Sequence, residues 1–130
     1  MTTSKATILI VEDEAKMRRL LELDLGDDGF RTVSAEDAET GLKLLQNGSV
    51  DLVITDLKLP GMNGLDLLKQ LGPELHDVPA IIITGRGSEE RAVAAIEAGA
   101  FWYIEKPLKG PVLHALLDRA LRRARPSSRR

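Results

Sequence analysis

The sequence predicts an α/β fold in which a doubly wound parallel sheet of five strands is covered by five helices. Two observations predict it. Five short runs rich in β-branched residues alternate along the chain with stretches whose apolar residues recur at helical spacing. The chain has 130 residues, enough for one compact domain and too few for a second full one. Alternating strands and helices in so short a domain indicate parallel strands joined by right-handed crossovers.

The predicted strands are short and mostly apolar. They cover residues 7–11, 31–34, 52–55, 80–83 and 101–104. Three of the five are nearly continuous apolar runs, which is the pattern of parallel strands covered by helices on both faces. We expect the flavodoxin-like strand order 2-1-3-4-5, with ligands bound outside the carboxyl ends of the strands.

Each predicted helix follows a strand and has apolar residues three and four positions apart. These residues are Met17, Leu20, Leu21 and Leu25 in the first helix, Ala38, Leu42 and Leu45 in the second, Leu65, Leu68 and Leu71 in the third, Val93 and Ile96 in a weaker fourth, and Leu113, Leu116, Leu117, Ala120 and Leu121 in the fifth. Gly48, Gly72 and Gly99 stand where the second, third and fourth helices should end.

The composition excludes several classes of protein. Hydrophobic residues make up 43% of the chain and charged residues 29%, so we expect a folded domain rather than a disordered chain. Without cysteine, neither a disulfide framework nor a thiolate metal site can form. No apolar run approaches the roughly 20 residues of a membrane span, and the first residues do not resemble a secretory signal. We therefore expect a cytoplasmic protein without membrane contact.

The net charge of −2 is unevenly distributed. Residues 122–130 contain five arginines and no acid, which leaves 13 basic residues against 20 acidic ones in the rest of the chain. Such an acidic body repels a nucleic-acid backbone, so we expect no direct contact of the domain with nucleic acid. We assign residues 1–124 to the domain and residues 125–130 to a basic tail or the start of a linker.

Polar residues follow four of the predicted strands and should meet at one edge of the sheet. They are Glu12 and Asp13 after the first strand, Asp56 after the third, Thr84 after the fourth and Lys106 after the fifth. Taken singly, each has an ordinary explanation, such as a helix cap or a surface charge. Carboxylates packed together repel one another unless a cation relieves the repulsion, and Mg²⁺ prefers oxygen ligands of this kind.

We therefore expect Glu12, Asp13 and Asp56 to hold Mg²⁺. Asp56, central in the sheet, is best placed to act as a nucleophile that forms an acyl phosphate. Lys106 and Thr84 should then bind oxygens of the phosphoryl group.

The chain resembles the receiver domains of bacterial two-component response regulators from about Ala6 to Arg123. Four segments carry the resemblance: ILIVEDE, DLVITDLKLPGMNGLDLL around Asp56, IIITGRG with Thr84, and AGAFWYIEKPL. The resemblance implies that a sensor histidine kinase transfers a phosphoryl group to Asp56 in an Mg²⁺-dependent reaction. It also implies that Lys58 supplies a backbone carbonyl to the metal and that Glu12, an aspartate in many members, acts mainly through water.

The same resemblance implies a signalling module that assists its own phosphorylation and dephosphorylation rather than an enzyme. Thr84 and Tyr103 are the implied switch residues, coupling Asp56 to the surface of the fourth helix, fifth strand and fifth helix, and a cis bond is implied before Pro107. The AGAFWYIEKPL segment is most similar to receivers of nitrogen-regulation-type transcriptional activators, so we expect a transcriptional output. Trp102 leads us to expect a homodimer, or the docking of an output partner, at this surface.

Two other α/β proteins fit the sequence less well. A dehalogenase-type phosphatase needs a second acid two residues after its nucleophile, where this chain has Lys58. A flavin or dinucleotide binder needs a phosphate-binding loop after the first strand, where the acids Glu12 and Asp13 would repel phosphate.

We also expect Lys58 and Arg86 to flank the path of water to a phosphorylated Asp56 and to slow the hydrolysis of its phosphoryl group. His76 and His114 do not follow strands, and we expect both to be surface or helix residues.

Overall fold

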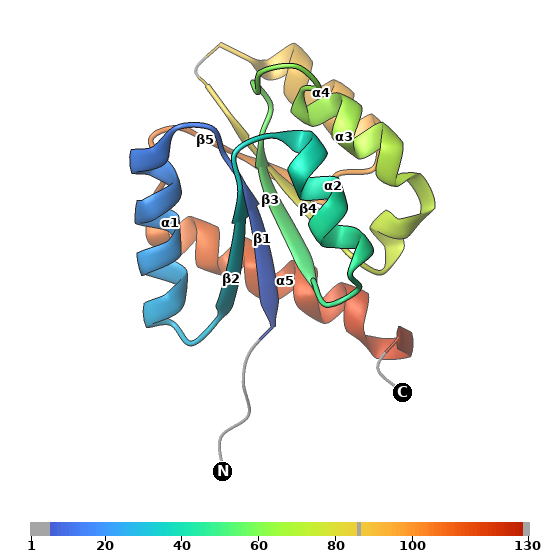
Figure 1. Cartoon of the computed structure of the whole chain (residues 1–130). Helices are drawn as coiled ribbons and strands as arrows, with labels where there is room; N and C mark the ends of the chain where they lie inside the picture. Colours follow the sequence, from blue (N-terminus) through green and yellow to red (C-terminus); the bar gives the residue numbers. More distant parts are fainter. Residues whose placement is uncertain (1–5, 86, 129–130) are drawn as a thin grey trace.

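The computed structural model describes residues 6–85 and 87–128, and its centre is a five-stranded parallel sheet of order β2-β1-β3-β4-β5 (Figure 1). The strands are β1 (Thr7–Val11), β2 (Arg31–Ala35), β3 (Leu52–Asp56), β4 (Ala80–Thr84) and β5 (Trp102–Glu105). All four neighbouring pairs of strands are parallel. The predicted fold class and strand order are therefore confirmed.

Helices cover both faces of this sheet. They are α1 (Ala15–Asp27), α2 (Ala38–Gln46), α3 (Gly64–Leu71), α4 (Glu89–Glu97) and α5 (Gly110–Ser128). Helices α1 and α5 lie on one face, and α2, α3 and α4 lie on the other (Figure 1). A 3-10 helix, η1 (Gly72–His76), follows α3 and was not predicted. Within the described residues, no helix is both long and apolar enough to cross a membrane.

The helix ends follow from local chemistry. Gly48, Gly72 and Gly99 have φ values of 81°, 47° and 114°, in the left-handed region that favours glycine, and they stand where α2, α3 and α4 end. Helix α5 continues through Ser128, past the boundary we set at residue 124. The assignment of residues 125–130 to a tail or linker remains a prediction.

Polar contacts join α1 to α5. Nε2 of His114 lies 2.9 Å from Oδ2 of Asp24, and its Nδ1 lies 3.2 Å from Oδ2 of Asp28. His114 is thus a half-buried helix residue away from the strand ends, whereas the side chain of His76 lies outside the described residues.

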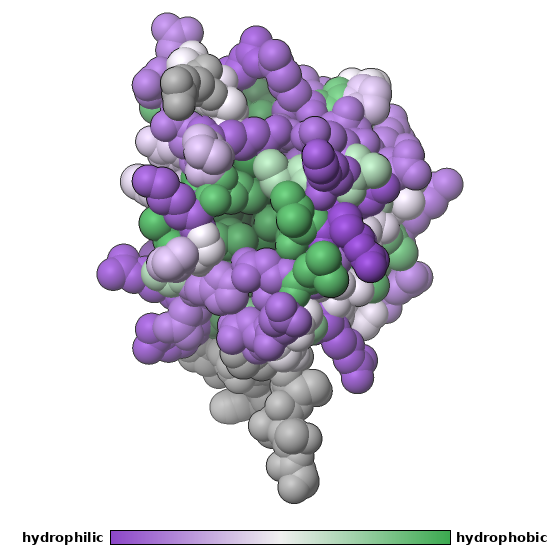
Figure 2. Space-filling view, turned by 90° about the vertical axis from the view of Figure 1, so that its left-hand side faces the viewer, coloured by the Kyte–Doolittle hydropathy of each residue, from purple (hydrophilic) through white to green (hydrophobic). Residues whose placement is uncertain are grey.

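Figure 2 shows the side of the molecule that carries α1, where apolar residues gather in a hollow framed by hydrophilic ones.

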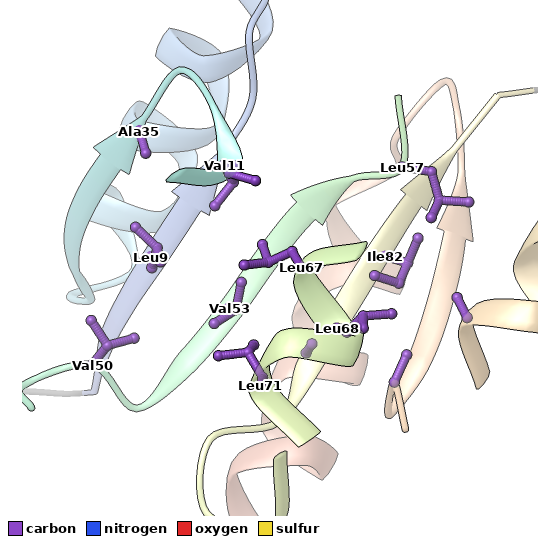
Figure 3. Packing of buried hydrophobic residues seen from close by; sticks show 14 residues of the cluster. Leu9, Val11, Ala35, Val50, Val53, Leu57, Leu67, Leu68, Leu71 and Ile82 are labelled. Carbon is purple, nitrogen blue, oxygen red and sulfur yellow. The ribbon is translucent and has the colours of Figure 1, made fainter. Parts of the chain in front are cut away.

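Two buried clusters hold the layers together. Side chains alternate along each strand, so Leu9, Val53 and Ile82 pack under α2, α3 and α4 (Figure 3), while Ile8 and Ile54 pack against α1 and α5. Every residue of β3 and of β4 is buried. Because each fully buried Ile or Leu contributes about 1.5–3 kcal/mol, this core fixes the central strands and the edge at which they end.

Candidate functional site

The parallel sheet brings distant polar residues to one edge. In the ladder between β1 and β3, Val11 lies opposite Thr55, so the next residues of the two strands, Glu12 and Asp56, reach the edge together. Lys106 directly follows β5 and reaches the same edge. Residues far apart in the chain therefore face one another across the carboxyl ends of the strands, as expected for this class of sheet.

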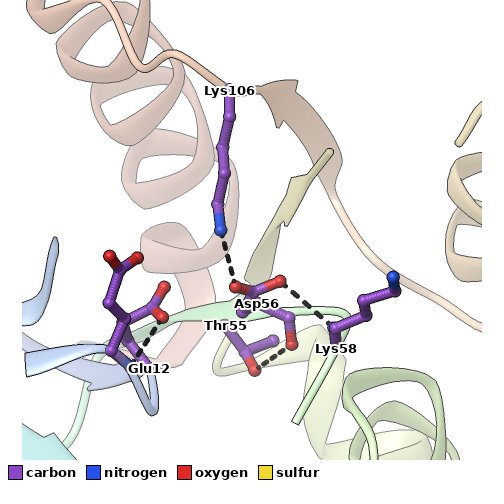
Figure 4. A network of polar contacts seen from close by, with 6 residues as sticks. Glu12, Thr55, Asp56, Lys58 and Lys106 are labelled. Atoms are coloured by element: carbon purple, nitrogen blue, oxygen red, sulfur yellow. Dashed lines mark hydrogen bonds and ion pairs between the residues drawn. The ribbon is translucent and has the colours of Figure 1, made fainter. Parts of the chain in front are cut away.

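Asp56 is buried and has both carboxylate oxygens engaged. Only 6% of the residue is exposed. Its Oδ1 accepts a hydrogen bond of 3.1 Å from the backbone N–H of Lys58, and its Oδ2 accepts one of 3.0 Å from Nζ of Lys106 (Figure 4). Charge-assisted bonds of this kind offset the cost of burying an ionised carboxylate. Asp56 is thus held in a defined orientation.

Glu12, Asp13 and Asp56 form an acidic cluster. Each offers a carboxylate oxygen, and these oxygens lie within 4.8 Å of one another. The Oε2 of Glu12 accepts a hydrogen bond from the backbone N–H of Glu14, but its buried Oε1 has no hydrogen-bond partner among the described residues. A buried oxygen without a partner is costly. A set of carboxylate oxygens with one unsatisfied member fits a hard divalent cation such as Mg²⁺.

The electrostatics of Glu12 reflect this crowding. Burial raises the pKa of Glu12 from 4.5 to about 7, and the charges of Asp56 and Asp13 act in the same direction. The hydrogen bond from the Glu14 amide and the charge of Lys106 oppose the rise in this pKa without cancelling it. The cluster can therefore hold a proton near neutral pH, and a divalent cation would compete with that proton.

Lys106 is held at the site by its backbone as well as its side chain. Its N–H donates a 2.8 Å hydrogen bond to the carbonyl of Thr84, and its peptide bond to Pro107 is cis, as the resemblance implied. Burial lowers the pKa of Lys106, but the hydrogen bond and charge of Asp56, together with nearby acids, raise it above the ordinary value. The ammonium therefore stays protonated beside Asp56.

The two expected switch residues occupy different positions. Thr84 is the last residue of β4 and is buried at the edge of the sheet. Tyr103 lies opposite Ile82 in the middle of β5 and packs against the cluster under α2, α3 and α4. Its ring stacks on that of Trp102, with 5.6 Å between the ring centroids. Thr84 thus lies at the edge with Asp56 and Lys106, while Tyr103 lies further down the sheet.

Sequence reasoning missed three residues that support the site. Nη1 of Arg18 donates a 2.8 Å hydrogen bond to the carbonyl of Glu12, and the hydroxyl of Thr55 donates one to the carbonyl of Asp56. Gly64 begins α3 so close to Asp56 that a Cβ would lie 2.4 Å from the Asp56 carbonyl oxygen. No local signal in the sequence identifies these contacts, because each depends on how the helices pack.

Comparison with known proteins agrees with this geometry. Residues 8–118 match the family model described as the response regulator receiver domain. The chain is 40% identical over 119 residues to the chemotaxis protein CheY-3 of Vibrio cholerae, covering 89% of this chain and 92% of that protein. It is 35% identical over 128 residues to the transcriptional regulatory protein GlrR of Escherichia coli, covering 98% of this chain and 29% of that protein.

Solved structures give the same result. Full-length FixJ from B. japonicum superimposes with a TM-score of 0.89 at 34% identity, covering 97% of this chain and 62% of that chain. The receiver domain of NtrX from Brucella abortus superimposes with a TM-score of 0.83 at 38% identity, covering 88% of this chain and 98% of that domain. The chain spans about a third of the length of GlrR and under two thirds of FixJ. The chain belongs to the response regulator receiver domain family, the phosphoacceptor modules of two-component signalling.

Proposed function

We propose that Asp56 is the phosphoacceptor of this receiver domain and that it takes its phosphoryl group from the phosphohistidine of a sensor histidine kinase. The observation that carries the proposal is the orientation of Asp56, whose two oxygens are held by Lys58 and Lys106 beside an acidic cluster. A carboxylate fixed in this way is a suitable nucleophile for phosphoryl transfer. The chain then acts as a signalling phosphoacceptor that assists its own phosphorylation and dephosphorylation, rather than as an enzyme with a separate substrate.

The acidic cluster supports Mg²⁺ as the metal of the reaction. Asp13, Asp56 and the backbone carbonyl of Lys58 would hold the ion, with Glu12 acting mainly through water. When bound, Mg²⁺ neutralises charge on the oxygens of the transferred phosphoryl group. The unsatisfied Oε1 of Glu12 supports this assignment, because a buried carboxylate oxygen gains a partner when a hydrated cation binds.

Lys106 and Thr84 would bind the phosphoryl group after transfer. The ammonium of Lys106 lies 3.0 Å from Oδ2 of Asp56 and would donate hydrogen bonds to the negatively charged phosphoryl oxygens after transfer. The hydroxyl of Thr84 would donate to a second phosphoryl oxygen, and Tyr103 would respond to its movement. The switch would thereby change the surface of α4, β5 and α5.

We propose that this surface, formed by α4, β5 and α5, forms a homodimer or docks the output partner. Three of its apolar residues are about half exposed: Val93 on α4, Trp102 on β5 and Val112 on α5. A groove of about 440 Å³ runs beside β5 and is lined by Trp102, Val112 and Leu116 among others. Exposed aromatic and aliphatic side chains beside a groove are typical of contact surfaces. The output would be transcriptional, and the domain itself would work in the cytoplasm without contacting nucleic acid or membrane.

Intact-mass measurement after incubation with acetyl phosphate and Mg²⁺ tests the phosphoacceptor. One phosphoryl group should be added to the wild type, and none when Mg²⁺ is replaced by a chelator. Asp56→Asn should abolish the addition, whereas Asp118→Asn, on the exposed face of α5, should leave it unchanged. Labelling of Asp56→Asn to the wild-type extent would show that another residue is the acceptor.

A further inference from the structure

A groove next to the acidic cluster shares Asp13 and Lys58 with the proposed metal site and extends beyond it. It has a volume of about 680 Å³ and lies between the segment that follows β3 and the first turn of α4. Asp13 lines it from the acidic cluster, and Arg91 lines it from α4. Its volume is within the roughly 300–1,000 Å³ usual for sites that bind small molecules. The groove therefore joins the phosphoacceptor edge to a space large enough for a small phosphodonor.

The charges of the groove favour an anion. Lys58 and Arg91 both line it, both are exposed, and neither makes an ion pair with another residue of the part of the chain that the structure describes. Among the described residues, the only acidic one that lines the groove is Asp13, whose charge a divalent cation in the cluster would offset. Glu89 and Glu90 precede Arg91 on the same helix but do not line the groove.

The rest of the lining is mainly apolar. Leu57, Leu59 and Leu65 are buried or half-buried, and all three line the groove. An apolar wall with two cations suits a ligand that has a short hydrocarbon group beside a developing negative charge. An acyl group on phosphate is such a ligand, because its methyl or methylene carbons are apolar and its bridging oxygen becomes a carboxylate oxygen on cleavage.

The direction of the reaction relates this groove to Asp56. The N–H of Lys58 bonds to Oδ1 of Asp56, so the lysine that lines the groove is anchored beside the nucleophile. As an Asp56 oxygen forms its bond to phosphorus, the bond from phosphorus to the acyl oxygen breaks, and its electron pair stays on that oxygen as a carboxylate. No proton or further reactant is needed. The new negative charge develops on the side of phosphorus away from Asp56.

We propose that this groove is the leaving-group subsite for small acyl phosphates. Arg91 is the residue that makes the receiver prefer them to phosphodonors whose leaving group is neutral. The proposal rests on Asp56 being the phosphoacceptor. Arg91 stabilises the carboxylate as it forms, with Lys58 as the second cation of the subsite. A preorganised cation at the position where charge develops lowers the barrier of the chemical step.

A pair of donors separates this role from a general effect on Asp56. Acetyl phosphate releases acetate, which is an anion. Phosphoramidate releases ammonia from an already protonated nitrogen, so no negative charge develops on its leaving group. Removal of Arg91 should therefore slow transfer from acetyl phosphate and leave transfer from phosphoramidate almost unchanged.

The experiment measures the initial rate of phosphorylation by intact mass in saturating Mg²⁺ for wild type, Arg91→Ala, Arg91→Lys and Arg119→Ala. Arg119 is an exposed arginine on α5 outside the groove and serves as the control. With acetyl phosphate, Arg91→Ala should react about three- to fivefold more slowly, the effect of losing one solvent-exposed charge interaction. With phosphoramidate, its rate should stay within about twofold of wild type. Arg91→Lys should retain most of the acetyl phosphate rate, and Arg119→Ala should match wild type with both donors.

Two outcomes would overturn the proposal while leaving Asp56 as the acceptor: an equal loss of rate with both donors, or no loss with either. Failure of both donors to label the wild type would instead refute the phosphoacceptor assignment, and this inference with it. Thermal unfolding of Arg91→Ala checks that the variant is folded, which is expected because alanine favours helix at an exposed position of α4.

Discussion

Nζ of Lys106 lies 3.0 Å from Oδ2 of Asp56, although 50 positions separate the two residues in the chain. The contact exists because β3 and β5 end at the same edge of the sheet, with β4 between them. Asp56 is almost fully buried, so its carboxylate depends on this cation for stabilisation. In the proposed function, the same ammonium would bind the phosphoryl group carried by Asp56.

The first prediction follows from this pair. Lys106→Met should lower the free energy of unfolding of the metal-free protein by about 1–2 kcal/mol, because it leaves the buried carboxylate of Asp56 without its cation. The loss is limited because about a third of the Lys106 side chain is exposed to solvent. Urea unfolding in a chelator measures it, with Lys69→Met on the exposed face of α3 as the control. Equal stability of the Lys106 variant and wild type would contradict the prediction.

The second prediction concerns pH and Glu12. The pKa of Glu12 is about 7 in the folded protein against 4.5 ordinarily, so the folded state binds the extra proton more tightly than the unfolded state. The stability that this proton contributes is fully present below about pH 4.5 and is lost as the pH rises through 7. Glu12→Gln should remove this loss, making the metal-free variant more stable than wild type at pH 8 by up to about 3 kcal/mol.

Urea unfolding at pH 5, 6, 7 and 8 in a chelator tests the Glu12 prediction. Glu14→Gln, at an exposed position two residues away, is the matched control and should follow the wild-type profile. Addition of Mg²⁺ should stabilise the wild type more at pH 8 than at pH 5, because the metal binds the ionised carboxylates. Profiles for wild type and Glu12→Gln that run parallel from pH 5 to 8 would contradict the assignment of the proton to Glu12.

The third prediction concerns the lifetime of the phosphorylated state. Lys58 is exposed beside Asp56, and its side chain can shield the phosphoryl group from water. Lys58→Ala should therefore speed the loss of the phosphoryl group by about two- to fivefold. Arg86 lies outside the described residues, and the sequence predicts the same effect for Arg86→Ala. Intact mass measures the loss of the phosphoryl group over time in the two variants and the double mutant. Rates equal to wild type in all three would contradict a shielding role for these side chains.

The fourth prediction tests the close approach of α3 to the backbone of Asp56. A Cβ on Gly64 would lie 2.4 Å from the carbonyl oxygen of Asp56 and 2.9 Å from Cα of Leu57, so the backbone itself must move. Gly64→Ala should cost about 1–3 kcal/mol of unfolding free energy. Gly26→Ala in α1 is the control, because its Cβ meets nothing within 4 Å, and it should stabilise the protein by about 0.5–1 kcal/mol. Similar effects of both substitutions in denaturant unfolding would contradict the packing.

The fifth prediction concerns self-association at the surface of α4, β5 and α5. Trp102 is 49% exposed there, so Trp102→Ala should weaken a homodimer without unfolding the domain. Sedimentation velocity of wild type and variant, each with and without beryllofluoride, measures the assembly. A larger mass for the wild type with beryllofluoride than for the variant is the expected result. Identical masses in all four samples would exclude self-association and leave partner docking as the use of this surface.

The fold class, and the edge of the sheet at which the polar residues gather, could be predicted from the sequence alone. Strand and helix periodicities are local, and the apolar runs at residues 52–55 and 80–83 already indicate strands buried on both faces. Because parallel strands end at a common edge, polar residues that follow them, such as Asp56 and Lys106, can be assigned to one site without coordinates.

Which of these residues are in contact, and which of their polar atoms have hydrogen-bond partners, depends on how the helices pack on the sheet. Helix packing leaves the Oε1 of Glu12 buried without a hydrogen-bond partner among residues 6–85 and 87–128, and it brings Arg91 of α4 into the groove beside Lys58. It also places α3 so that Gly64 approaches the carbonyl of Asp56. These features depend on the position and orientation of each helix on the sheet. That placement is set by the packing of side chains from distant parts of the chain, and a local periodicity does not contain it.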